Sequence, residues 1–333
     1  MRRTVLSVPV LLAALVAATA PGVARGDGLP VLGVDVGSTG VASSSGSRYV
    51  TIPAGSRTIV AQVAQQGGQV LAWRSLRGTF TIPAVAYDGS ASGLSADGTT
   101  LVLIEPRTSF PRAATKLLVL RTYGLNPQRV VRLQGDFSFD AVSPGGAWLY
   151  FIHYVSPKDP TRYLVQTYDV RRGRLLAKPI TDPHEPGDKM RGNPLSRTMS
   201  TDGRWAYTLY DGAGATAFVH ALDTVARTAH CIDLDGIAAG TDLSRLRLGI
   251  ARDGQHLVVR DTAAPMFLVD LRTLRVARAT RAAAALGGTR QFPPLLLLAA
   301  ASAAVAAVVA GAIWARRRQR QPLIPNLDPQ SEN

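Results

Sequence analysis

A short turn motif recurs along the chain at a spacing close to fifty residues, and this repeat limits the fold more than any other feature. In each copy an apolar residue lies four positions before a glycine, and a β-rich run opens about three positions after it. Consecutive glycines are 48 to 57 residues apart. The copies centre on Gly98, Gly146, Gly203 and Gly254, with a weaker copy at Gly46.

The residue types in the motif predict a tight turn between two strands. Aspartate or serine before the glycine can cap backbone N–H groups, while glycine adopts a positive φ at no steric cost. Asp97, Asp202 and Asp253 could also be viewed as a carboxylate cluster. Turn formation explains their spacing completely, so we assign them to turns.

A second β-rich pair follows each turn, which gives four strands per repeat. Four strands in about fifty residues is the size of a propeller blade, and closing five blades into a ring removes exposed sheet edges. The sequence therefore predicts an all-β, five-bladed β-propeller. The second pairs are Thr58–Gln65 with Gln69–Leu76, Lys116–Tyr123 with Arg129–Leu133, Arg162–Val170 with Arg174–Ile180, Thr216–Asp223 with Thr228–Leu234, and Met266–Leu271 with Arg275–Thr280.

The Ser-x-Asp-Gly turn, with aspartates before the second turn at Asp169, Asp223 and Asp270, resembles TolB-like β-propellers of the WD-repeat-like and YVTN-like group. The resemblance covers Val31 to Thr280. It looks closest to exported, membrane-anchored TolB-like proteins of high-GC Gram-positive bacteria. The resemblance implies binding of a protein or ligand at one end of the ring, and it supplies no catalytic residue and no cofactor.

The N-terminal segment has the pattern of a secretory signal peptide. Arg2 and Arg3 precede an apolar run from Val5 to Ala20, and small residues follow up to Ala24. We expect cleavage after Ala24, giving a signal peptide over residues 1–24. An uncleaved N-terminal anchor is the alternative, and either version would export the middle of the chain.

The C-terminal region predicts one membrane span. Leu295 to Ala315 contains no charged residue, and at 1.5 Å rise per residue it would reach roughly 30 Å, the thickness of a bilayer core. Four arginines follow at once, and such charge marks the cytoplasmic side. The predicted order is a propeller (25–280), a linker (281–294), a transmembrane helix (295–315) and a cytoplasmic basic tail (316–333). This makes a single-pass protein of the cell membrane with an extracytoplasmic propeller.

The net charge bears on the class of partner, and the cysteine count bears on how the fold is held together. The chain carries a net charge of +14, which could suggest nucleic acid. An exported domain meets proteins, peptides and anionic envelope polymers instead, so we expect one of these as the partner and no nucleic acid. Cys231 is the only cysteine, so no intrachain disulfide can form, and its apolar–polar alternation predicts a packed strand residue.

The long connections between strands are expected to share one face of the propeller, opposite the short turns. Long loops on a rigid scaffold are where binding sites are usually built. We expect binding there, centred on the polar loop Thr181–Arg197, with neighbouring aromatic side chains as anchors. The alternative for Tyr154 and Tyr210 is that they only end their strands. The candidate residues are Glu105, Arg107, Phe110, Tyr154, Lys158, Asp182, His184, Glu185, Asp188, Lys189, Arg191, Tyr210 and Asp211.

Two alternatives concern the acidic residues. Asp182, His184, Glu185 and Asp188 could supply metal ligands, but no helix or strand fixes them, so we favour a solvated loop without a metal. A glycosidase-like hydrolase with carboxylates near the channel would use Asp140, Asp211 and Glu105. No serine-hydrolase, zinc-protease, P-loop or CxxC motif is present, and a non-enzymatic binding or scaffold protein is favoured.

Overall fold

The computed structural model describes residues 40–66, 68–185, 190–238, 240–261 and 264–279. Within these ranges the regular structure is β-strand apart from three short 3-10 turns, so the all-β prediction is confirmed. No helix in the described ranges is long and apolar enough to cross a bilayer. The predicted signal segment, linker, transmembrane helix and tail lie outside the described residues, as do the candidates Asp188 and Lys189.

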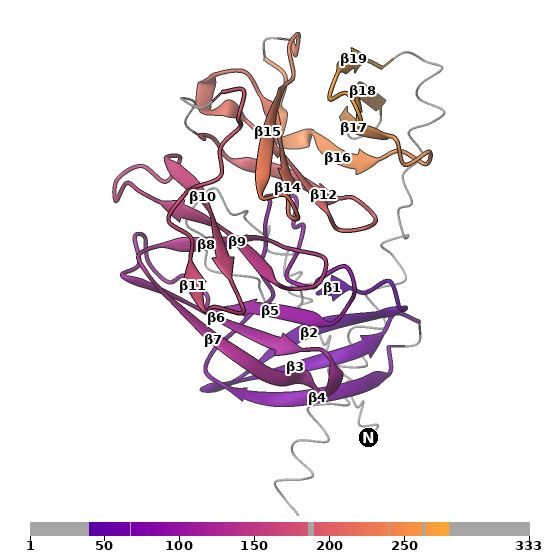
Figure 1. Cartoon of the computed structure of the whole chain (residues 1–333). Coiled ribbons are helices and arrows are strands. Elements are labelled where there is room, and N and C mark those ends of the chain that lie inside the picture. The colour runs from indigo at the N-terminus through magenta and orange to yellow at the C-terminus, as the bar shows by residue number, and fades with distance from the viewer. Residues whose placement is uncertain (1–39, 67, 186–189, 239, 262–263, 280–333) are drawn as a thin grey trace, which may run out of the picture.

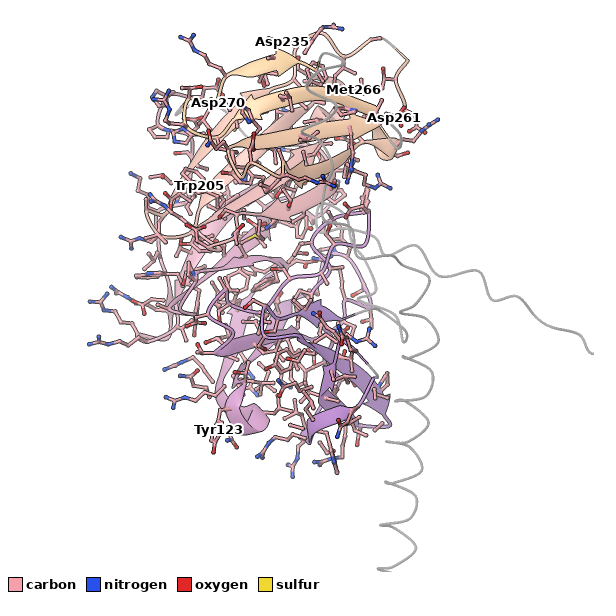
Figure 2. The ribbon with its side chains drawn as sticks, turned by 90° about the vertical axis from the view of Figure 1, so that its right-hand side faces the viewer. Tyr123, Trp205, Asp235, Asp261, Met266 and Asp270 are labelled. Carbon is pink, nitrogen blue, oxygen red and sulfur yellow. The ribbon has the colours of Figure 1, made fainter. Side chains whose placement is uncertain are left out.

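The strands form five antiparallel sheets that follow one another along the chain, here called sheets 1 to 5. Figures 1 and 2 show them in series, with sheet 1 at one end and sheet 5 at the other. Sheet 1 holds β1 (Val41–Ala42), β2 (Ser47–Ala54), β3 (Arg57–Ala64) and β4 (Val70–Arg77), and sheet 2 holds β5 (Thr100–Ile104), β6 (Ala114–Arg121) and β7 (Asn126–Gln134). Sheet 3 holds β8 (Phe137–Val142), β9 (Trp148–Tyr154), β10 (Tyr163–Asp169) and β11 (Arg174–Leu175). Sheet 4 holds β12 (Pro194–Met199), β13 (Trp205–Tyr210), β14 (Phe218–Asp223) and β15 (Thr228–Asp233), and sheet 5 holds β16 (Arg247–Ile250), β17 (His256–Asp261), β18 (Ala264–Asp270) and β19 (Val276–Arg278).

In sheets 1, 3, 4 and 5 the repeated motif forms the turn between the first two strands, as predicted, and in sheet 2 it joins Leu94, which bridges to Leu101, to the first strand β5. In sheet 4, Ser200 Oγ donates to Asp202 Oδ1 at 2.6 Å, and the Trp205 amide donates to Ser200 Oγ at 2.8 Å. Sheet 2 repeats this geometry with Ser95 and Asp97. All five motif glycines have φ between +69° and +78°, which disfavours any side chain there.

The second turn of sheets 3, 4 and 5 is held by an aspartate that ends the third strand. The Asp223 carboxylate accepts backbone N–H bonds from Val225 and Ala226 at 2.9 and 2.8 Å. Asp169 and Asp270 accept equivalent bonds, and Figure 2 labels Asp270 on sheet 5. These carboxylates therefore stabilise turns.

Buried apolar clusters join each sheet to the next. Successive antiparallel meanders packed in this way, four of them four-stranded and sheet 2 three-stranded, resemble the arrangement of β-propeller blades. In the described part of the chain, four clusters link sheets 1 to 2, 2 to 3, 3 to 4 and 4 to 5, and none links sheet 5 back to sheet 1. Closure into a five-bladed ring therefore stays a prediction. Representative pairs are Val60 with Leu103, Val131 with Phe151, Tyr150 with Ala206, and Leu209 with Leu257.

Candidate functional site

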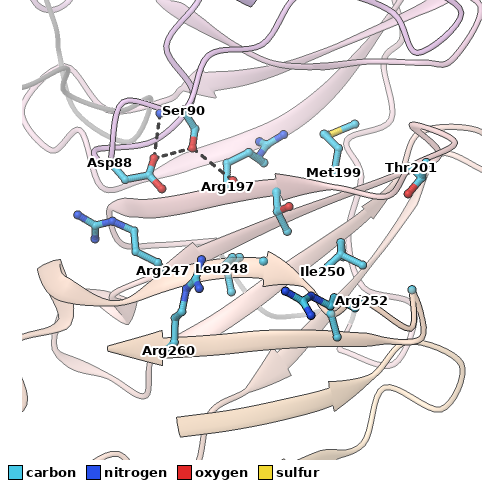
Figure 3. A pocket seen from close by; sticks show the side chains of 14 residues that line it. Asp88, Ser90, Arg197, Met199, Thr201, Arg247, Leu248, Ile250, Arg252 and Arg260 are labelled. Atoms are coloured by element: carbon cyan, nitrogen blue, oxygen red, sulfur yellow. Dashed lines mark hydrogen bonds between the residues drawn. The ribbon is translucent and has the colours of Figure 1, made fainter. Parts of the chain in front are cut away.

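A cavity of about 1060 Å³ lies between the first strands of sheets 4 and 5. β12 and β16 form two of its walls, and they are tied together where the Leu248 amide donates to Ser196 Oγ at 2.9 Å. Residues 88–90 form a third wall (Figure 3). The cavity extends to the turn at Gly254, so it spans the length of β16.

An inserted hairpin from sheet 2 supplies the third wall. Thr81 pairs with Ile104 and Leu94 pairs with Leu101, so the chain between them leaves the sheet and returns. The amides of Tyr87 and Asp88 donate to the carbonyls of Pro194 and Leu195 on β12, at 3.0 and 3.1 Å. The hairpin therefore crosses from sheet 2 to sheet 4 and fixes the cavity wall by backbone hydrogen bonds.

Four arginines line this cavity beside a single carboxylate, that of Asp88. Asp88 Oδ1 accepts bonds from the Ser90 amide and hydroxyl at 2.9 and 2.6 Å. Arg247 on β16 and Arg260 on β17 are direct cross-strand partners, so their side chains share one face of sheet 5. The four arginines are Arg197, Arg247, Arg252 and Arg260, labelled in Figure 3.

A second cavity of about 480 Å³ continues the first toward the repeated turns. The two share Ser90, Met199 and Thr201. Its other lining residues come mostly from β1, from residues 89–96 and from the turn after β12, and many of them are serines. The two cavities are therefore continuous, and the second, hydroxyl-rich cavity leads into the first, arginine-lined one.

Arg197, which lines the first cavity, forms a buried ion pair with Asp140. Arg197 contacts the Asp140 carboxylate through Nη2 and donates to the Asp140 carbonyl at 3.1 Å, and both side chains are almost fully buried. His220 is also buried in this region, and its burial lowers its pKa to about 4, with Asp140 opposing the shift and Arg197 adding to it. Asp140, a candidate carboxylate of the hydrolase alternative, is thus neutralised by Arg197.

A second buried network ties the connection after β5 to sheet 3. Arg107 donates to Asp136 Oδ1 through Nε and Nη2 at 3.0 and 2.8 Å, and to Ser138 Oγ at 2.8 Å. Arg112 Nε lies 3.2 Å from the same carboxylate. Asp136 is 1 % exposed at its side chain, so this network lies in the interior.

Arg107, Tyr154 and Tyr210, which were predicted binding residues, are buried between the sheets. Arg107 belongs to the Asp136 network and is 4 % exposed. Tyr154 and Tyr210 are 6 and 2 % exposed and pack in the cluster between sheets 3 and 4, because each side chain at the end of its strand faces the neighbouring sheet. The burial of these three side chains corrects the expectation that they make contacts at the surface.

The other predicted residues lie around the long connections. Phe110 packs edge-on against Tyr154 with ring centroids 5.6 Å apart, and Lys158 is exposed. Arg191 lines a cavity of about 380 Å³ together with Thr161, Arg162 and Leu164. Of these residues, Phe110 and Tyr154 are in contact, while Arg191 is the one described member of the predicted set that lines the cavity. Glu105 lies 3.9 Å from Lys116, and Asp211 accepts bonds from the Asn193 and Ala213 amides.

Asp182 and His184 lie together, and the structure adds His230 to them. Asp182 Oδ1 lies 3.2 Å from His184 Nδ1 and 3.7 Å from His230 Nδ1. Burial raises the pKa of Asp182, but bonds from the His184 and Cys231 amides and the His184 side chain outweigh it and hold that pKa below its usual range. Glu185 is exposed beside them. The sequence missed His230 because it lies about fifty residues further along the chain, on β15.

Comparisons with known proteins give a likeness of fold. No protein-family model and no curated protein matches the sequence. Solved structures similar to this chain include a functionally unknown protein from Desulfotomaculum acetoxidans DSM 771, at 12 % identity and a TM-score of 0.42 over 74 % of each chain. TolB from Acinetobacter baumannii matches at 15 % identity and a TM-score of 0.33, over 70 % of this chain and 57 % of TolB. The Cps50 (Swd1) β-propeller domain of Myceliophteria thermophila matches at 10 % identity and 0.39, over 79 and 70 %. No residue role follows from likenesses at this level.

The four arginines of the cavity between β12 and β16 were absent from the predicted site. A sequence signal exists for one of them, since Arg247 lies between Leu246 and Leu248 in the alternation of a strand, which places its side chain on the face opposite to theirs. The sequence could not show that Arg260, on the next strand, and Arg252, in the turn before that strand, line the same cavity.

Proposed function

We propose that this chain is a non-enzymatic, extracytoplasmic binding protein anchored in the cell membrane. The arginine-lined cavity between β12 and β16 binds an anionic stretch of a protein, peptide or cell-envelope polymer. The proposed address rests on the signal segment and on the apolar span with its arginine boundary. Surface proteolysis of intact cells tests it: residues 40–279 should be degraded while an epitope placed after Asn333 survives.

The pairing of Arg247 with Arg260 carries the proposal for the ligand. Like charges directly opposite each other on neighbouring strands are destabilising. Both side chains border the cavity of about 1060 Å³, which has one carboxylate among its lining residues. An anion bound between the two guanidinium groups offsets their repulsion, and arginine binds carboxylate or phosphate in a two-pronged geometry.

The candidate carboxylates favour binding over hydrolysis. Glycosidase chemistry needs two carboxyl groups at roughly 5 to 9.5 Å in different environments, one of them holding a proton. Asp140 is paired with Arg197, Asp211 caps the turn at Gly212–Gly214, and Glu105 lies on the exposed side of sheet 2 near Lys116. Each of the three is engaged with a different local partner.

The test uses the full-length chain in detergent with two probes, inorganic polyphosphate and poly-glutamate. Replacing Arg247 and Arg260 together by glutamine should weaken binding of the preferred probe at least about tenfold, which corresponds to about 1.4 kcal/mol. The preference between the probes distinguishes a phosphate ligand from a carboxylate ligand.

The matched control replaces Arg121 and Arg132, two exposed arginines of sheet 2, by glutamine and removes the same charge. It should bind both probes as the parent chain does. An equal loss in both double variants would show a response to net charge alone and would overturn the cavity as the site. Failure of the parent chain to bind either probe would reject the proposed ligand class.

A further inference from the structure

The connection from sheet 3 to sheet 4 and the last strand of sheet 4 bring three metal-binding side chains together. Asp182, His184 and His230 each offer one ligand atom, and these atoms all lie within 4.8 Å of one another. Two imidazoles and one carboxylate form a donor set suited to a divalent transition ion such as Zn²⁺. No other group of three histidine, cysteine, aspartate or glutamate donors occurs among the described residues.

The two distances from Asp182 to the histidine nitrogens are close to those of a tetrahedral site. Zinc bonds to imidazole nitrogen and carboxylate oxygen of about 2.0 to 2.2 Å place neighbouring ligand atoms about 3.4 Å apart in a tetrahedron. The carboxylate oxygen of Asp182 lies 3.2 Å from His184 Nδ1 and 3.7 Å from His230 Nδ1. Small side-chain rotations would therefore be enough to admit the ion.

Two of the three groups are held by the fold. Asp182 is 8 % exposed, and its carboxylate accepts the amides of His184 and Cys231, both at 2.8 Å. Such hydrogen bonds orient a ligating carboxylate. His230 is on β15, where its ring lies 6.3 Å from that of Trp205, a residue labelled in Figure 2.

The third group is supplied from the surface. The side chain of His184 is 78 % exposed and that of His230 is 25 % exposed. Their rings are tilted by 33° with centroids 5.6 Å apart. An ion bound here would be reachable from solvent, and its fourth position would be filled by water or by a ligand atom of a partner.

We propose that Asp182, His184 and His230 form a binding site for a divalent transition ion of the zinc class. The ion fastens the connection after β11 to β15, the outer strand of sheet 4. This connection is part of the polar loop for which the sequence predicts binding, so the ion would hold Asp182 and His184 of that loop against β15 and add an electrophilic contact there. The site is separate from the arginine-lined cavity and does not depend on the anionic ligand proposed for it.

A pair elsewhere in the chain provides the matched control. His256 Nδ1 lies 2.7 Å from Asp253 Oδ2, so it has the same carboxylate–imidazole contact. The described residues place no third donor of these types beside it. A single exposed pair of this kind should bind zinc weakly.

The experiment titrates Zn²⁺ into the full-length chain, freed of any histidine tag and stripped by a chelator, in competition with a chromophoric chelator. One ion per chain should bind and raise the thermal unfolding midpoint. His184→Ala should weaken zinc binding about 100-fold or more, because removal of even an indirect supporting group costs roughly 10- to 100-fold. His256→Ala should leave the affinity unchanged.

A second measurement locates the ion. Zinc should slow amide hydrogen exchange at 181–185 and 228–233 in the parent chain and in His256→Ala, but not in His184→Ala. Since His184 is exposed, its replacement should leave the fold intact. Absence of saturable binding, an equal loss in both variants, or protection elsewhere would each overturn the site.

Discussion

Arginines occur in two contrasting settings in this molecule. Arg107 and Arg197 are buried, and each contacts an aspartate that is also buried. Arg247 and Arg260 line an open cavity, where they lie opposite each other on neighbouring strands. The same side chain thus serves the interior in one region and a ligand surface in the other.

The difference between the two settings follows from the cost of desolvation. A buried charge has to be compensated by a partner within the protein, and removing that partner leaves an uncompensated ion. A charge that borders a cavity can still exchange solvent contacts for those of a ligand, even where protein groups hold it, as the Ser244 and Leu246 carbonyls hold Arg247 Nη1 at 2.7 and 2.9 Å. We therefore expect the buried arginines to control stability and the cavity arginines to control affinity.

The largest expected effect comes from removing the carboxylate shared by Arg107 and Arg112. Asp136→Ala would leave two guanidinium groups without their buried counter-charge, and we expect it to lower the free energy of unfolding by about 3 to 5 kcal/mol. Urea denaturation of the full-length chain measures this. The control is Asp261→Ala, which removes the partner of Arg245 in an exposed pair and should cost less than about 1 kcal/mol. Similar losses in both variants would contradict the contrast.

The next effect is a pH dependence caused by His220. Its pKa is lowered by burial to about 4, whereas an unfolded histidine titrates near its ordinary value of about 6.5. Its contribution to stability is therefore complete above pH 6.5 and is lost as the pH falls toward 4. The shift corresponds to about 3 kcal/mol. The charged or titratable groups around it are Asp140, Arg197, Asp182 and His230.

Urea unfolding between pH 7 and pH 4 tests this contribution. His220→Gln should flatten the pH dependence in that range by about one proton. An unchanged slope in His220→Gln would show that other groups, such as His153, cause the acid sensitivity. The pKa of His153 is also lowered by burial.

The repeat explains how much of the fold the sequence could predict. Turn chemistry is local, so Asp97, Asp202 and the motif glycines can be assigned from neighbouring residues alone, and the predicted second hairpins coincide with strand pairs of all five sheets. The hairpin of residues 84–92 is an insertion within a strand, and its partner on β12 lies about one hundred residues away. Local patterns carry no information about such a contact.

The candidate site was less predictable for the same reason. Asp182 and His184 are adjacent in the chain and were found, while His230 reaches them only through the pairing of β15 with β14. Arg247 and Arg260 are neighbours only through the register of β16 with β17. Tyr154 and Tyr210 were expected on the surface, and they are buried because adjacent sheets pack over the ends of their strands.

The smallest expected effect concerns the contribution of Arg247 and Arg260 to the stability of the protein. This effect separates the buried arginines from the cavity-lining arginines most sharply. Replacing both Arg247 and Arg260 by glutamine removes a cross-strand repulsion, and surface substitutions usually change the free energy of unfolding by no more than about 0.5 kcal/mol. We expect a change within this range or a slight gain, measured as a shift of the urea midpoint without a change of slope. The same variant should lose affinity for the anionic probe, so that stability and binding move independently. A loss of about 2 kcal/mol or more would show that these arginines support the fold, and the distinction between buried and cavity-lining arginines would then fail.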